Sequence, residues 1–333
     1  MSLALGSSGI MTSAWTALMR RRFRSYALGR DGNPIKIDGY FGYDEEAVQV
    51  EYQRRTGQEP TGQVSDDDLH RLGLTPTLIS THGTGQPDPF GIGYPADIAR
   101  RMVERGLYRW QPTGNYPATA VPMNRSADDG EREINRFIDT PSIVPGPVAF
   151  VDYSQGSICA GRVRNRIRRG DAPKHITLLG GVTIGNPMRP KDDYAGTVNP
   201  GGMGIDPVLE TTTPGLIHLA APGDLYTTNP GGDTGEMERA IFNAVFSRFT
   251  GRDSILEQIA ELIERPFWEG IAMGRAILRG GMFLVRGTGP HVRYHIDQCP
   301  GTGQTYYEHA VSHLERLAVD RLEAMVALER AVT

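Results

Sequence analysis

The stretch Val148-Ala149-Phe150-Val151-Asp152-Tyr153-Ser154-Gln155-Gly156-Ser157 decides the fold of this 333-residue chain. Its first four residues are apolar and predict a buried strand, and the residues that follow have the spacing of a helix. A serine at the sharp turn between such a strand and such a helix is held where a substrate carbonyl can reach it. We therefore predict that Ser154 is a catalytic nucleophile.

The serine of this turn normally lies between two glycines, in the pattern Gly-x-Ser-x-Gly of serine hydrolases. The second glycine is present as Gly156, and we expect it to let the helix pass close to a strand because it has no side chain. Asp152 replaces the first glycine. That glycine mainly relieves crowding beneath the turn, so Asp152 weakens the pattern without removing it. The alternative is a strand that ends at a purely structural serine.

The elements around this turn alternate between strand and helix. The patterns predict strands at 77–81, 107–111, 148–151, 175–180 and 215–220, and helices at 96–105, 130–139 and 157–168. Strands that are separated by helices form parallel sheets, so we predict an α/β fold with a mostly parallel central sheet. Segment 235–285 is almost wholly helical in pattern, which suits a linker, a lid or a structural buttress.

A serine nucleophile needs a base, and the base needs a carboxylate that orients it. In α/β-hydrolases the chain order is serine, acid, histidine. Asp224 is the first carboxylate after the predicted strand 215–220, and we choose it as the acid. Asp206 is the main rival, and Asp192 and Asp193 are weaker candidates.

The base should lie in a loop before the last helix, where His291 and His295 both occur. We prefer His291 because it follows Gly-Pro and precedes Tyr294 by three residues, but the sequence leaves His295 open. His309 and His313 lie four residues apart at a spacing that suits metal ligands. They lack the glutamate of a zinc protease, so we interpret them as a solvated helix face.

The oxyanion that forms during attack needs hydrogen-bond donors that are already in place. One donor should be the backbone N–H of Gln155, which follows the nucleophile. The other should come from the glycine-rich loop after the first predicted strand, and there we choose Thr84.

Composition excludes several classes of protein. The net charge of −4 argues against a general nucleic-acid binder. The basic run Arg162, Arg164, Arg166, Arg168 and Arg169 is therefore interpreted as a solvated helix face. Two cysteines, Cys159 and Cys299, are too few for a disulfide scaffold, but they do not exclude one disulfide bond between them. No apolar run is long enough to span a membrane, and the N-terminus has no secretory signal pattern.

The first 75 residues form a unit with a different pattern, in which three short helices are predicted. This unit resembles the peptidoglycan-binding domain of many cell-wall hydrolases. The resemblance rests on residues 6–9, 38–42, 47–48, 52–53 and 61–64. The unit has nine Lys or Arg and ten Asp or Glu residues, which suits a glycan-peptide ligand better than nucleic acid. We therefore divide the chain into domains at 1–75 and 76–333.

Residues 76–333 resemble the cutinase-like serine esterases in the serine turn, in His82-Gly83-Thr84, in Ala-Pro-Gly-Asp224 and in the late His-x-x-Tyr. Together with the N-terminal unit, the whole chain resembles the lysin B family of mycobacteriophages, which are mycolylarabinogalactan esterases. The resemblance implies hydrolysis of the ester between mycolic acids and arabinogalactan, and of simpler lipid esters. It implies peptidoglycan as a further partner, no cofactor, no metal and no stable membrane insertion. It also implies synthesis in the host cytoplasm without a signal peptide, and action at the cell wall after the membrane is permeabilised.

Two other functions fit the same residues. A general lipase or cutinase would use the same catalytic residues, with the small domain serving only to localise it. A cell-wall binding protein with a degenerate hydrolase fold would need no nucleophile, and Asp152 is the feature that favours this interpretation.

Overall fold

The structure is a computed structural model that describes residues 2–119, 123–236, 238–239, 242 and 289–332. The predicted helical segment 235–285 lies almost wholly outside the described residues.

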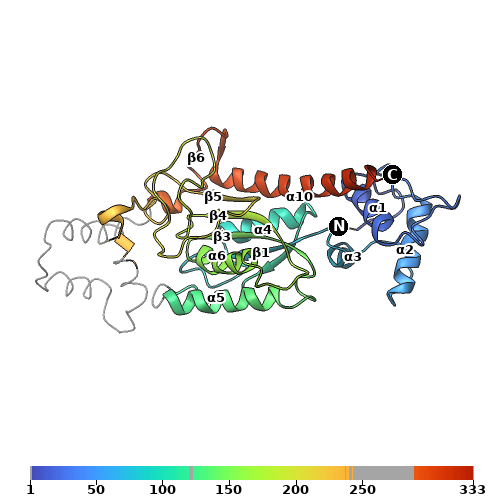
Figure 1. Ribbon diagram of the computed structural model, residues 1–333, viewed down its shortest axis with the longest axis horizontal. Helices are drawn as coiled ribbons and strands as arrows, with labels where there is room; N and C mark the ends of the chain where they lie inside the picture. Colours follow the sequence, from blue (N-terminus) through green and yellow to red (C-terminus); the bar gives the residue numbers. More distant parts are fainter. Residues whose placement is uncertain (1, 120–122, 237, 240–241, 243–288, 333) are drawn as a thin grey trace, which may run out of the picture.

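A five-stranded sheet forms the centre of the molecule (Figure 1). Its strands are β1 (Thr77–Thr81), β2 (Arg109–Pro112), β3 (Pro147–Tyr153), β4 (Thr177–Ile184) and β5 (Leu216–Leu219). Their order is β2-β1-β3-β4-β5, and every neighbouring pair is parallel. This confirms the predicted α/β fold with a parallel central sheet. A short antiparallel pair, β6 (Gln298–Cys299) and β7 (Gln304–Thr305), lies outside it.

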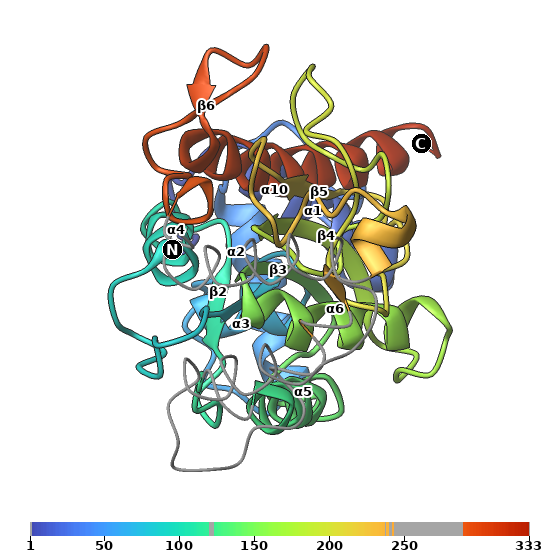
Figure 2. The same ribbon diagram turned by 90° about the vertical axis from the view of Figure 1, so that its left-hand side faces the viewer.

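Helices cover both faces of the sheet (Figure 2). On one face lie α4 (Tyr94–Glu104) and α10 (Tyr306–Arg330), and on the other lie α5 (Met123–Ile138) and α6 (Gln155–Arg168). Side chains of β3 alternate between the two cores, since Ala149 and Val151 pack toward α4 and α10 while Val148 and Phe150 pack toward α5 and α6. Full burial of a side chain such as Phe150 stabilises the fold by about 1.5–3 kcal/mol. Burial on both faces explains why the strand has a continuous apolar pattern.

The parallel arrangement brings the carboxyl ends of all five strands to one edge of the sheet. Ser154 follows β3, the middle strand, while Thr84 follows β1 and Asp224 follows β5. In open α/β sheets, ligands bind outside this edge. The topology therefore assembles side chains that lie far apart in the sequence.

The N-terminal unit contains α1 (Ile10–Arg22), α2 (Tyr43–Arg55) and α3 (Asp66–Arg71), close to the three helices expected there. Trp15 and Phe41 are fully buried in its core. Leu322 and Val326 of α10 belong to the same core, and Figure 1 shows α10 running from the sheet to the N-terminal unit. The first and last parts of the chain are therefore folded together.

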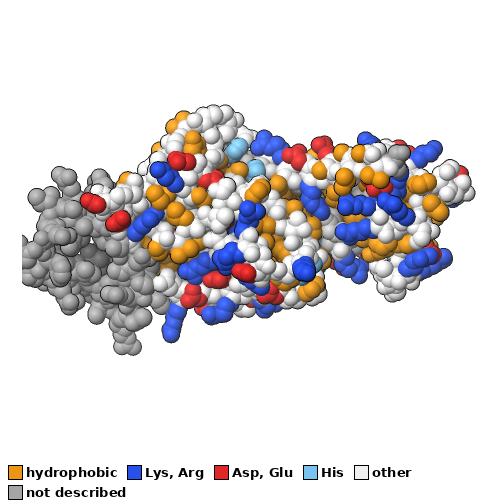
Figure 3. Space-filling view, in the orientation of Figure 1, with side chains coloured by type: hydrophobic (Ala, Val, Ile, Leu, Met, Phe, Trp, Pro, Cys, Tyr) orange, Lys and Arg blue, Asp and Glu red, His pale blue; other side chains and the backbone are white. Residues whose placement is uncertain are grey.

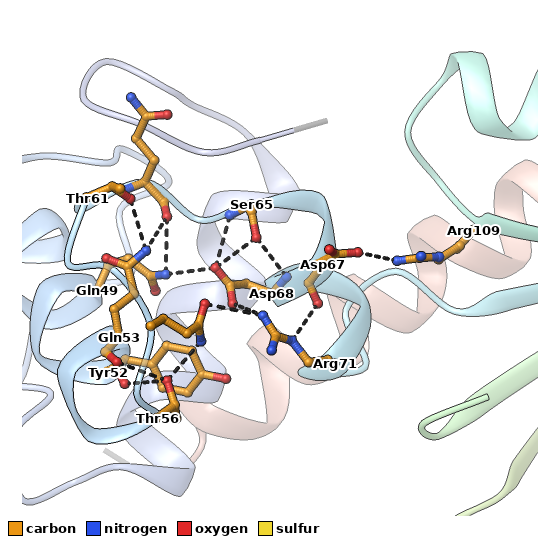
Figure 4. Close-up of polar contacts among 12 residues, drawn as sticks. Gln49, Tyr52, Gln53, Thr56, Thr61, Ser65, Asp67, Asp68, Arg71 and Arg109 are labelled. Atoms are coloured by element: carbon orange, nitrogen blue, oxygen red, sulfur yellow. Dashed lines mark hydrogen bonds and ion pairs between the residues drawn. The ribbon is translucent and has the colours of Figure 1, made fainter. Parts of the chain in front are cut away.

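Polar contacts hold the N-terminal unit in place (Figure 4). Asp68 is fully buried and accepts hydrogen bonds from Ser65 and Arg71. On the same helix, Asp67 pairs with Arg109 at the start of β2. These contacts connect the interior of the unit to the sheet through α3.

His70, also on α3, gives this junction a pH dependence. Its Nε2 lies 2.9 Å from Thr77 Oγ1 at the start of β1, and burial lowers its pKa from 6.5 to about 4. Between these values the unfolded chain binds more protons than the folded one, so stability should fall as the pH drops through this window. We expect His70→Gln to lose this part of the pH dependence, measured as the free energy of unfolding in urea between pH 7 and pH 4. A constant difference between the two proteins across that range would contradict the prediction.

Candidate active site

The backbone at Ser154 has the strained geometry of a nucleophile turn. Its φ of 54° and ψ of −121° are rare for a residue with a side chain, and such strain costs about 1–3 kcal/mol. The N–H of Ser154 donates to the carbonyl of Ile184 at the end of β4, over 2.9 Å. The side chain therefore leaves the sheet at the junction of β3 and α6, as the sequence predicted.

Gly156 lets α6 pass very close to a strand, as expected. A Cβ atom at this position would lie 2.4 Å from the carbonyl oxygens of Thr81 and His82. Thr81 is the last residue of β1 and His82 follows it, so the close approach is to the end of the strand beside the one that carries Ser154. No larger residue fits without moving the helix.

The three side chains chosen as nucleophile, base and acid meet at this edge. His291 Nε2 lies 2.9 Å from Ser154 Oγ, and His291 Nδ1 lies 2.8 Å from Asp224 Oδ2. His291 belongs to the short helix η1 (Pro290–Val292), and Asp224 follows β5. Both are buried. His295 lies elsewhere, with its Nδ1 2.8 Å from the hydroxyl of Tyr94.

Two tyrosines hold Asp224 and His291. The hydroxyl of Tyr294 donates to Asp224 Oδ2 over 2.6 Å, and the hydroxyl of Tyr153 donates to the backbone carbonyl of His291 over 3.0 Å. Burial raises the pKa of Tyr294 well above its usual value, so its hydroxyl stays protonated and keeps donating. The His-x-x-Tyr spacing is visible in the sequence, but it does not identify the carboxylate that the tyrosine binds.

The remaining candidates have other partners. Asp206 accepts from the N–H of Val208 in its own loop, and Asp192 accepts from Asn199. Asp193 lies 3.8 Å from His218. His313 lies 2.8 Å from the carbonyl of Gly215, and His309 lies 3.4 Å from Gln304. Within the described part of the chain, no three His, Cys, Asp or Glu residues are grouped to hold a metal ion.

The loop that carries Thr84 lies against the nucleophile. A Cβ atom on Gly83 would lie 3.2 Å from the Cβ of Ser154. The hydroxyl of Thr84 donates to Gln155 Oε1 over 3.0 Å, and Gln155 Nε2 donates to the carbonyl of Thr119 over 3.2 Å. Gln155 is the first residue of α6, so its backbone N–H has no acceptor within the helix. The two residues chosen as oxyanion donors thus lie on the two segments beside Ser154.

Asp152 is fully buried beneath the turn and is paired. Its Oδ2 contacts the guanidinium of Arg164 on α6. Arg164 also binds both carboxylate oxygens of Glu210, with 3.0 Å between Nη2 and Oε2, and Asn186 donates to Glu210 over 3.1 Å. Asp152, which replaces the first glycine of the serine turn, therefore connects β3 to α6 through Arg164, and Arg164 connects both to the loop before β5 through Glu210.

The guanidinium of Arg164 pairs with two carboxylates in this cluster, and the pKa values of the two carboxylates shift in opposite directions. Burial raises the pKa of Asp152 to about 6, despite the opposing charge of Arg164. Burial also acts on Glu210, but the charge and hydrogen bonds of Arg164 outweigh it and lower the pKa of Glu210. The prediction that Arg164 belongs to a solvated face is wrong, because its side chain is 0% exposed. A charge pattern along one helix does not reveal buried carboxylates from other segments.

Gly185, directly after β4, leaves space for the imidazole of His291. It has a φ of +60°, and a Cβ atom there would lie 2.6 Å from His291 Cε1. We expect Gly185→Ala to displace the imidazole and to lower kcat for a soluble ester about 10²-fold, because small displacements at a reacting centre are costly.

Gly223→Ala is the matched control for this substitution. Gly223 has a φ of +81°, so alanine is strained there too, but the nearest atom to its Cβ would be Pro290 Cγ at 3.8 Å. Equal losses of kcat in the two variants would mean that backbone strain, and not the position of His291, causes the effect.

The comparisons with known proteins identify the family. Endolysin B of Mycobacterium phage L5 is 39% identical over 237 residues, which are 64% of this chain and 91% of the phage protein. The chain belongs to the endolysin B family. Endolysin B of Mycobacterium phage D29 is 37% identical over 240 residues, 63% of this chain and 90% of that protein. The crystal structure of lysin B from mycobacteriophage D29 matches with a TM-score of 0.52 at 32% identity, covering 72% of this chain and 99% of that one. No family model matches the chain.

Membership of the endolysin B family confirms the resemblance found in the order of the motifs.

The structure also answers three questions that the sequence raised. Cys159 and Cys299 are both free and buried, so they do not form a disulfide bond with each other. Among the helices that the structure describes, none combines the length and the apolar character needed to cross a bilayer. On the face seen in Figure 3, basic side chains are spread along the molecule with acidic ones among them.

Proposed function

We propose that this chain is a serine esterase that hydrolyses the ester between mycolic acids and arabinogalactan in the mycobacterial cell wall. The observation that carries the proposal is the continuous hydrogen-bonded path from Asp224 through His291 to Ser154, at a strained turn on the edge of a parallel sheet. Membership of the endolysin B family supports the cell wall as the place of action.

In the proposed mechanism, His291 Nε2 removes the proton of Ser154 as Oγ attacks the ester carbonyl. Asp224 holds the Nδ1 proton of His291 and stabilises the imidazolium, while Tyr294 fixes the carboxylate. The imidazolium then protonates the departing alcohol oxygen, and the acyl group stays on Ser154. Water, deprotonated by His291, attacks this acyl-enzyme, and the proton returns to Ser154 as the acid leaves.

The backbone N–H groups of Gln155 and Thr84 are proposed to stabilise the oxyanion in both steps. The hydrogen bond between the two side chains supports this assignment, because it holds the loop of Thr84 against the start of α6. The carbonyls of Thr119 and Met123 anchor the side chain of Gln155. We expect these contacts to hold both donors in place before the substrate arrives.

The N-terminal unit, residues 1–75, is proposed to bind peptidoglycan and so to hold the esterase at the wall. A polar cavity of about 460 Å³ supports this role. Its lining includes Gln53, Thr61, Gln63, Ser65 and Asp68. Figure 4 shows Gln53 and Thr61 to one side of Ser65 and Asp68, which lie at the start of α3 and within it. The α10 residues in the core of this unit mean that its binding is best tested in the full-length chain.

The direct test is incubation of the purified protein with mycolylarabinogalactan, followed by chromatography of the released lipids. The proposal predicts free mycolic acids, and a fluorophosphonate label should modify Ser154 and block their release. Modification at a different residue would overturn the mechanism.

The two alternatives give different results in the same assays. A general lipase or cutinase would cleave short-chain and lipid esters but release nothing from the polymer. A wall-binding protein with a degenerate site would sediment with peptidoglycan and cleave no ester.

A further inference from the structure

A second cavity lies between α5 and the loop after β2, at the edge of the sheet that carries Ser154. It is a shallow hollow of about 670 Å³ that is largely open to solvent. The walls include Pro87, the loop 114–117, and the α5 side chains Asp129, Arg132, Glu133 and Arg136. None of these residues belongs to the proposed catalytic set.

The charged side chains of this cavity neutralise one another. Arg136 donates two hydrogen bonds of 2.8 Å to Glu133, and Arg132 pairs with Asp129. Glu133 is only 7% exposed, and hydrogen bonds, first from Arg136 and then from Asn115, hold its pKa below the usual range. Two cations and two anions leave no net charge. A wall of paired donors and acceptors without net charge suits a neutral ligand with many hydroxyl groups better than an ion.

The rest of the cavity supplies ring surfaces. The exposed rings of Pro87 and Pro117 line it together with the polar side chains, while the ring of Tyr116 is buried in the core beneath them. A sugar ring presents hydroxyl groups at its rim and apolar C–H groups on its faces, so it matches both kinds of surface. An acyl chain would cover the exposed polar side chains of the cavity without making hydrogen bonds to them, which is costly.

The cavity is connected to the nucleophile by two loops. The N–H of Gly85, next to Thr84, donates to the carbonyl of Ala118 over 2.7 Å. The carbonyl of Thr119 accepts from the side chain of Gln155. The segments that flank Ser154 therefore continue directly into the walls of the cavity.

We propose that this cavity binds the carbohydrate half of the ester, a neutral polyhydroxyl chain, and so selects the alcohol side of the substrate. The proposal rests on the proposed esterase function. It predicts that the cavity contributes to the hydrolysis of a sugar ester and not to that of an ester without a sugar.

Gly114 provides a test that leaves the catalytic residues untouched. It lines the cavity, and a Cβ atom there would meet no other atom within 4 Å. We expect Gly114→Trp to fill the cavity and Arg132→Ala to remove one of its donors, while Gly114→Ala is the control that leaves the space open. Binding of arabinogalactan freed from mycolate by base is measured by calorimetry, alongside hydrolysis of p-nitrophenyl butyrate. Affinity should fall about tenfold in the first two variants, roughly the effect of losing one good polar contact, with butyrate hydrolysis unchanged.

Absence of binding by the wild type, or equal affinity in all four proteins, would overturn the proposal. An equal loss of butyrate hydrolysis in Gly114→Trp would overturn it as well, because the substitution would then act on the catalytic residues. A separate result would contradict the proposed function: the wild-type protein would release no mycolic acid from mycolylarabinogalactan. Binding to freed arabinogalactan does not depend on that release, so the two failures can be distinguished.

Discussion

Ser154→Ala and His291→Ala are each expected to lower kcat for a soluble ester by about 10⁴- to 10⁶-fold, as in other enzymes that use such a set of residues. Without Oγ no acyl-enzyme can form, and without the imidazole the hydroxyl keeps its proton. Because the residues act as a unit, the double variant should be little worse than either single one. The measurement is the rate of p-nitrophenyl butyrate hydrolysis by proteins whose circular dichroism matches that of the wild type.

His295→Ala is the matched control for the base. It lies four residues after His291 in the same loop, but its ring contacts the hydroxyl of Tyr94 and not Ser154. Its kcat should stay within a few-fold of the wild-type value. A large loss in His295→Ala with little change in His291→Ala would exchange the roles of the two residues and overturn the mechanism.

Arg164→Met is expected to lower the free energy of unfolding by about 3–5 kcal/mol, the usual cost of breaking a buried ion pair. The substitution leaves the carboxylates of Asp152 and Glu210 buried without their common cation. Urea unfolding at pH 7 measures the loss. The loss should shrink toward pH 5, because Asp152, with a pKa of about 6, takes up a proton and no longer needs a cation.

A triple variant separates charge from packing. Asp152→Gly and Glu210→Gln, added to Arg164→Met, remove both carboxylates and restore the glycine of the usual serine turn. Most of the lost stability should return, since replacing a whole buried ion cluster is often nearly neutral. Arg168→Met is the control on the same helix, and with an exposed side chain it should change stability by less than about 0.5 kcal/mol. A triple variant no more stable than Arg164→Met would show that the charges are not the cause.

Much of the candidate site could be predicted because its parts are local in sequence. The strand before Ser154 and the helix after it follow from the periodicity of residues 148–168. The place of Asp224 follows from its position after an apolar strand. The chain order of an α/β-hydrolase then restricted the base to one loop. Membership of the endolysin B family agrees with the predicted resemblance, and the parallel sheet agrees with the predicted fold.

Local patterns could not predict which partner each buried group finds. Arg164 belongs to a basic run that has the pattern of a solvated face, yet Glu210, 46 residues away, binds it in the core. Gly185 has no pattern of its own, but it leaves the space that His291 occupies. Likewise, the apolar residues of α10 predict a helix but not that Leu322 and Val326 complete the N-terminal core.

By itself, the sequence determined the elements, their order and the serine turn, because backbone geometry and apolar periodicity act over a few residues. Only the tertiary structure decided that His291 and not His295 lies beside Ser154, and that Asp152 is neutralised beneath it. The physical reason is the range of the interactions. Hydrogen bonds, including those within buried ion pairs, act over about 3 Å, and the fold alone brings residues separated by 137 positions to that distance.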